Sequence, residues 1–166
     1  MNHCIKNLQQ TLSFQLEEVY VTIKKLQQDL PAAARAITEP EMKSAFTSYR
    51  NHVDESRLKL KRIFSYLLCE PYGLKASVMS TPWDEIENRD VLPRLRDIML
   101  GNSLQNVIQY IITACIEARY IAMRLELDTV VRLLDEILDA EEEFLLTIKR
   151  LSATQVNHAC LMATAA

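Results

Sequence analysis

The sequence predicts an all-α protein, a single domain built as an antiparallel bundle of long helices. Only 2 of its 166 residues are Gly and 5 are Pro. A β-rich chain of this length would need more turn residues, because tight hairpins use backbone conformations that Gly adopts most readily. Apolar residues instead recur at steps of three and four, the spacing that places them on one face of a helix. This pattern covers four stretches of the domain 1–166, at about 5–30, 40–67, 103–125 and 129–151.

The first two predicted helices form a hairpin. Pro31 is expected to limit the first helix, because a proline ring cannot continue the hydrogen-bond ladder, and residues 32–37 can add a further turn or two. Thr38 is the expected N-cap of the second helix, since Glu41 stands three residues later at the spacing of a capping box.

The connection across residues 68–102 is expected to carry short helices. A Thr-Pro pair followed by acidic residues is typical of a helix start and predicts a short helix at 82–88. A second short helix is expected at 91–100, and Gly101 is expected to close it.

The third predicted helix is apolar on most of its faces. A helix of this kind lies in the centre of a bundle or is also buried in an oligomer interface. The fourth predicted helix follows Asp128, its expected cap, and ends near Leu151. Residues 152–166 are predicted to be a tail of small residues.

The lengths of the connections predict the topology. Short loops join the first helix to the second and the third to the fourth, so each pair is an antiparallel hairpin. Two hairpins joined by a crossover as long as 68–102 form a ferritin-like bundle, not a simple up-down-up-down bundle.

Charge and hydropathy exclude several classes of function. The 19 basic and 22 acidic residues are interspersed, so no basic stripe for nucleic acid is expected. No apolar stretch reaches the length of a membrane span, and the first residues lack the apolar segment of a secretion signal. The 4 cysteines are far apart and show no C-x-x-C spacing, which predicts reduced thiols in a cytoplasmic protein.

Three segments stand in the order and at the spacing of a known family: Glu18-Val19-Tyr20 and Asp29-Leu30-Pro31 in the first predicted helix, and Pro40-Glu41-Met42-Lys43-Ser44-Ala45-Phe46 at the start of the second. With these segments the chain resembles the bacterial ferritin-like family that includes the YciF and YciE stress proteins. The resemblance implies a four-helix bundle, commonly dimeric, with a di-metal carboxylate centre that holds iron or manganese. Further matching positions are Pro71, Gly73, Met79, Tyr120, Leu134, Leu138 and Glu141.

At the positions where the family carries metal ligands, this sequence departs from the pattern. Only His52 and Glu141 keep strong donor groups, and they are predicted to be the remnant of a metal site. Glu18 and Glu55, which fall beside the core stripe, are weaker candidates, as are Glu17 and Glu117. No metal or other cofactor is therefore expected. The remaining ligand positions are occupied by Ile23, Tyr49, Ser56, Thr113, Ile116, Ala140 and Leu145.

A carboxylate on a core stripe needs partners, because burying an unpaired charge is costly. Glu141 is therefore expected to bond to His52, Tyr49 or Thr113, or to be protonated. Ile23, Ile116 and Leu145 are expected to fill the vacated centre as ordinary core residues.

The leading functional hypothesis is a non-catalytic bundle protein that acts by self-association, as a homodimer, or by binding a protein partner, in a role related to stress. No catalytic residues are expected, since the sequence lacks nucleophile motifs such as G-x-S-x-G. The alternative is a di-iron or di-manganese carboxylate protein in oxidative stress or metal handling. A third hypothesis, a subunit or inhibitor within a larger assembly, is based on the apolar third helix.

Overall fold

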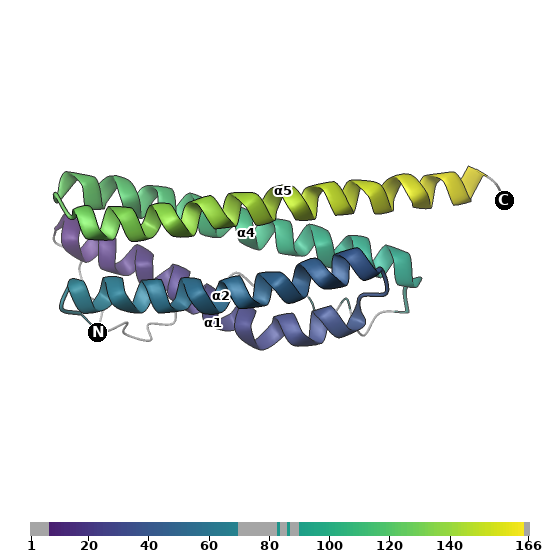
Figure 1. Ribbon diagram of the computed structural model, residues 1–166, viewed down its shortest axis with the longest axis horizontal. Helices are drawn as coiled ribbons and strands as arrows, with labels where there is room; N and C mark the ends of the chain where they lie inside the picture. The colour runs from purple at the N-terminus through teal and green to yellow at the C-terminus, as the bar shows by residue number, and fades with distance from the viewer. Residues whose placement is uncertain (1–6, 70–82, 84–85, 87–89, 165–166) are drawn as a thin grey trace.

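The protein is an all-α, ferritin-like four-helix bundle. The computed structural model describes residues 7–69, 83, 86 and 90–164. Neighbouring helices are antiparallel, whereas α2 and α4 run in the same direction (Figure 1). The chain between them therefore has to return from one end of the bundle to the other, as in the predicted crossover topology. The helices are α1 (Leu8–Ala36), α2 (Pro40–Tyr66), α4 (Pro93–Arg124) and α5 (Asp128–Thr164).

One hydrophobic core lies between the four helices. α1 packs against α2 and α4, and α5 packs against the same two helices. The apolar stripe of each helix supplies fully buried side chains, as the sequence periodicity predicts. Within the part of the chain that the structure describes, no helix is long and apolar enough to cross a membrane. Representative core residues are Leu16, Ile23, Phe46, Leu60, Leu104, Ile111, Leu134 and Ile148.

The predicted short helix at 82–88 lies mostly outside the described residues. Trp83 and Ile86 are described, and both are helical and buried. The indole N–H of Trp83 donates a hydrogen bond of 2.8 Å to Ser103 Oγ on α4. This bond satisfies the polar group of a large buried side chain, which aromatic residues with a polar atom generally require.

α1 passes through Pro31 and continues to Ala36. Pro31 thus limits the helix less than its missing N–H predicts. Leu30, Ala33 and Ile37 are buried on either side of it. Burial of these side chains offsets the loss of one backbone hydrogen bond, because tertiary packing provides most of the stability of a helix in a protein.

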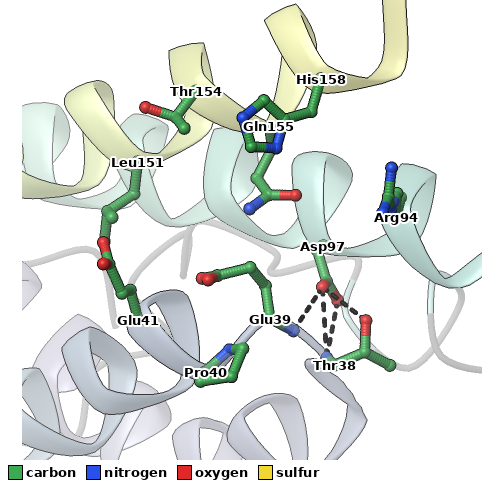
Figure 2. A pocket seen from close by; sticks show the side chains of 10 residues that line it. All are labelled: Thr38, Glu39, Pro40, Glu41, Arg94, Asp97, Leu151, Thr154, Gln155 and His158. Carbon is green, nitrogen blue, oxygen red and sulfur yellow. Dashed lines mark hydrogen bonds between the residues drawn. The ribbon is translucent and has the colours of Figure 1, made fainter. Parts of the chain in front are cut away.

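The predicted capping of α2 by Thr38 is wrong. The N-cap is Glu39, whose Oε2 accepts a 2.6 Å bond from the Met42 amide. Thr38 instead donates its hydroxyl to Asp97 of α4 at 2.7 Å, and the amides of Thr38 and Glu39 also donate to that carboxylate (Figure 2). Asp97 is fully buried. A buried carboxylate recruits the nearest donors, so the α1–α2 turn is held by another helix and not by a local capping box.

The predicted break at Gly101 is also wrong, because α4 is continuous from Pro93 to Arg124. Gly101 is buried inside the helix, and a Cβ atom there would lie 2.6 Å from Ser152 Oγ and 3.1 Å from Met42 Cε. The glycine therefore allows α4 to approach α5 and α2 closely, and it does not end a helix.

The predicted tail after Leu151 is helical instead, and α5 continues to Thr164. Ser152 and Gln155 are buried, so the helix still packs against the bundle beyond the predicted end. Figure 1 shows the C-terminal end of α5 extending past the start of α4. The small residues that indicated a tail are compatible with helix, and Ala is the strongest helix former.

Replacing Gly101 with Ala tests the close approach of α4 and α5. Helix propensity alone predicts a gain of about 1 kcal/mol in the free energy of unfolding. We expect the contact with Ser152 Oγ to abolish this gain and to give a net loss, measured by urea denaturation. In a Ser152→Ala background the same substitution should be stabilising. Equal effects in the two backgrounds would contradict the steric explanation.

Replacing Asp97 with Asn tests the tie between α4 and the α1–α2 turn. The amide has only one acceptor oxygen for three donor groups, so we expect a loss of about 1–3 kcal/mol in the free energy of unfolding. The control is Asp90→Asn. Because Asp90 is exposed, this substitution should change the free energy of unfolding little. If both variants unfold at the same urea concentration as the unmodified protein, the tie contributes nothing.

Candidate functional site

A group of polar side chains lies inside the bundle between α2 and α5. Tyr49, His52 and Ser56 of α2 and Glu141 of α5 are all buried, and Glu141 has no exposed surface. The spacing of three and four along α2 places its three residues on one face of that helix. We refer to these four residues as the central polar cluster.

Both carboxylate oxygens of Glu141 have partners in this cluster. The Tyr49 hydroxyl donates to Oε2 at 2.7 Å, and His52 Nε2 lies 3.0 Å from Oε1. Ser56 Oγ in turn lies 3.1 Å from the same histidine nitrogen. A buried carboxylate is costly unless it is hydrogen-bonded, and these contacts meet that requirement.

One tautomer of the histidine fits both contacts. With the hydrogen on Nε2, the imidazole donates to Glu141, and Ser56 Oγ lies close enough to share that donor.

The half-buried Phe144 ring covers one side of the cluster. The Phe144 ring stacks on the His52 ring with centroids 5.2 Å apart and meets the Tyr49 ring edge-on at 5.1 Å. Phe144 follows Glu141 by three residues on α5, so both face α2. The rings lower the local dielectric constant, which strengthens the hydrogen bonds within the cluster.

Two neighbouring groups show the electrostatic effect of this environment. Burial, together with the Glu141 carboxylate, raises the pKa of Tyr49 well above its ordinary value. Burial raises the pKa of the Cys115 thiol on α4, and Glu141 adds to that increase. Both side chains are therefore held in their neutral forms, and Cys115 is a poor nucleophile because only the thiolate reacts.

The predicted partners of Glu141 are partly confirmed. Tyr49 and His52 bond to it, but Thr113 does not: Thr113 is exposed, and its hydroxyl donates to the carbonyl of Gln109. The residue of α4 that faces inward near Glu141 is instead Cys115.

The three predicted filling residues differ in their positions. Ile23 is fully buried, as expected. Leu145 is partly buried and packs against the edge of the core. The prediction for Ile116 is wrong, because its side chain is 37% exposed. Tyr120, a position that matches the family, stands four residues after Ile116 on the same face of α4, and it is 64% exposed, so this face points outward.

The weaker candidate ligands lie elsewhere. Glu18 Oε2 accepts a 3.3 Å bond from Tyr110, and Glu117 Oε2 accepts a 2.8 Å bond from Gln15, so both join α1 to α4. Glu55 is exposed on α2. Glu17 is buried on α1. Across residues 7–69, 83, 86 and 90–164, no group of three or more His, Cys, Asp or Glu side chains is arranged to hold a metal ion.

Sequence reasoning did not identify Phe144 or Cys115 as part of this site. The signal for Phe144 was available, since it stands one helical turn after a core-facing acid. The signal for Cys115 lay in the spacing of Ile111, Cys115 and Ala118, which are all buried on the inward face of α4.

Comparisons with known proteins agree on the family and the fold. A family model described as domain of unknown function (DUF892) matches residues 7–161. No curated protein matches the chain. The family match and the similar solved structures confirm the resemblance to the family that includes YciF.

Three solved structures share the fold. The stress protein YciF of E. coli is 20% identical with a TM-score of 0.80, and the match covers 92% of this chain and 99% of that one. YcfI of Rhodopseudomonas palustris, described as a candidate structural protein, is 19% identical with a TM-score of 0.82, covering 90% and 97%. A protein of Xanthomonas campestris is 12% identical with a TM-score of 0.72, covering 95% and 99%.

The raised pKa of Cys115 predicts a loss of stability at alkaline pH. A thiol whose pKa is raised in the folded state stabilises that state fully below its ordinary pKa of about 9 and loses this contribution as the pH rises further. The slope can reach about 1.4 kcal/mol per pH unit for one group. We expect Cys115→Ala to make the fall in unfolding free energy above pH 9 shallower, as measured by urea denaturation in reducing buffer.

The matched control is Cys160→Ala, since Cys160 is an exposed cysteine on α5. Its stability should fall with pH as steeply as that of the unmodified protein. Parallel curves for both variants and the unmodified protein would show that Cys115 carries no proton linkage.

Proposed function

Because the chain belongs to the family described as domain of unknown function (DUF892), we propose that it is a non-catalytic ferritin-like bundle with a degenerate di-metal site, which acts by self-association. The proposal has two parts, the closed centre and the outer face of α4, and each is supported by different residues.

The central polar cluster supports the first part. Metal-binding bundles of this type use carboxylates from all their helices together with imidazoles. Here Glu141 and His52 are the strong donors, and both oxygens of Glu141 are already bonded to Tyr49 and His52. Tyr49 is held neutral by burial, which makes its oxygen a weak ligand. The inward position on α4 is occupied by Cys115, with the apolar Ile111 and Ala118 one turn to either side.

An exposed apolar row on α4 supports the second part, and it is the observation that carries the proposal. Ile116, Tyr120 and Met123 are 37%, 64% and 49% exposed, on the side of α4 opposite the buried Cys115 and Ala118. We call these three residues and Thr113 the outer stripe. Their spacing of three, four and three is that of the core positions in a coiled coil. Large apolar side chains gathered in one row mark an interaction surface more often than scattered ones do.

Charges beside the outer stripe favour pairing with a second copy in the antiparallel direction. Glu117 and Arg124 are both exposed and stand seven residues apart on one flank of the stripe. Two antiparallel copies bring Glu117 of each close to Arg124 of the other. A parallel arrangement gives Arg124 no acidic partner, because it would lie near Arg119, which is already paired with Asp135 of α5.

The similar solved structures support a non-catalytic role related to stress. The structural neighbours include a stress protein of E. coli, and we extend a stress-related role to this chain as part of the proposal. A bundle that contributes shape and a self-complementary surface needs no reactive centre. Replacing inward charges by aliphatic residues removes their desolvation cost, which favours such a protein.

Light scattering coupled to size exclusion tests the self-association. We expect a dimer in equilibrium with monomer at micromolar concentrations, because a single-helix contact lies at the low end of interface areas. Tyr120→Asp should give a monomer at all concentrations, since it places a charge in the centre of the stripe. Leu146→Asp, at an exposed apolar position on α5, is the control and should leave the dimer intact.

A charge exchange tests the orientation. Arg124→Glu should weaken the dimer, because it places like charges opposite each other, and adding Glu117→Arg should restore it. A protein that stays monomeric at high concentration would contradict the self-association. A double variant weaker than Arg124→Glu alone would contradict the antiparallel pairing.

A further inference from the structure

A pocket of about 370 Å³ lies at the end of the bundle, away from both the central polar cluster and the outer stripe. It is formed where the α1–α2 turn meets the start of α4 and the C-terminal part of α5 (Figure 2). Its volume falls within the range of small-ligand sites, which begins at about 300 Å³. We call it the end pocket. Its lining includes the side chains of Glu39, Glu41, Arg94, Asp97, Gln155 and His158.

Gln155 is the unusual residue of this pocket. Its side chain is only 7% exposed, and no residue in the described part of the chain forms a hydrogen bond with its amide, whose atoms face the pocket and keep contact with solvent there. Figure 2 shows the amide projecting from α5 toward Glu39 and Asp97 on the opposite wall. An amide that faces a pocket and has no protein partner offers both a donor and an acceptor to a ligand.

Charges of opposite sign stand on opposite sides of that amide. In Figure 2 the Glu39 and Glu41 carboxylates lie on one side of Gln155, and Arg94 lies on the other, with His158 above on α5. Glu39 uses Oε2 to cap α2, which leaves Oε1 to accept from a ligand. The exposed Arg94 guanidinium offers several N–H donors.

The remaining polar groups are already occupied by the fold. Both oxygens of Asp97 accept bonds from Thr38 and Glu39. The amide of Met42, in the first turn of α2, donates to Glu39. A simple anion site at the start of α2 is therefore disfavoured, because a carboxylate of the chain already caps that helix.

We infer that the end pocket binds a small zwitterion of the amino-acid type. Its ammonium group bonds to Glu39 Oε1 and Glu41, its carboxylate bonds to Arg94 with His158 beside it, and the Gln155 amide contacts the ligand between these ends. This arrangement uses the charges of both signs and the amide that faces the pocket.

Isothermal titration calorimetry with three probes of one chain length tests the inference: 4-aminobutanoate, 1,4-diaminobutane and butanedioate. We expect one molecule of 4-aminobutanoate to bind per chain, and the two single-sign probes to bind at least about tenfold more weakly, since each lacks one charge-assisted contact. Equal or tighter binding of the diamine or the diacid would overturn the zwitterion assignment. Failure of all three probes to bind would overturn the site.

Variants separate a binding role from a structural one. Gln155→Leu and Arg94→Gln should each weaken 4-aminobutanoate binding about tenfold or more. Gln28→Leu, at an exposed glutamine of α1 outside the pocket, should leave binding unchanged. Without ligand, Gln155→Leu should melt at the same temperature as the unmodified protein or higher. A markedly lower melting temperature would show that the amide serves the fold, and would contradict the inference.

Discussion

The burial of the Glu141 carboxylate is the constraint on which the centre of this bundle depends. A charged group without exposed surface is tolerated because Tyr49 and His52 occupy its two oxygens, at 2.7 and 3.0 Å. Those bonds fix the rotation of α2 relative to α5. The half-buried Phe144 ring stacks on His52 and covers one side of the site. Removing one partner would leave an unsatisfied buried group, so the cluster acts as a unit.

A second buried carboxylate organises the end of the bundle in the same manner. Asp97 binds the amides and hydroxyl of the α1–α2 turn, and Gly101, four residues later, lets α4 approach Ser152 and Met42. Near its start, α4 is thus bonded to the hairpin of α1 and α2. The outer stripe lies in the second half of α4. The same helix that completes the core therefore carries the surface on which the proposed self-association depends.

The helices and their pairing could be predicted because apolar periodicity and loop length are local signals. Their ends could not, since they depend on tertiary contacts. α1 passes Pro31 because buried residues flank it, and α4 passes Gly101 because a neighbouring helix needs the space. In the site, a core-facing acid predicted the partners Tyr49 and His52. Ile116 was misplaced because the third helix is apolar on most of its faces, so apolar periodicity alone does not define which of its sides faces the core.

The measurement that tests the central claim most directly is metal analysis of the purified protein, by mass spectrometry, after expression with added iron and manganese. If the central polar cluster has replaced a di-metal centre, the protein should hold well below one metal per chain, and Glu141→Gln should not change that amount. Two iron or manganese ions per chain, lost in Glu141→Gln, would contradict the account and would favour the di-metal alternative.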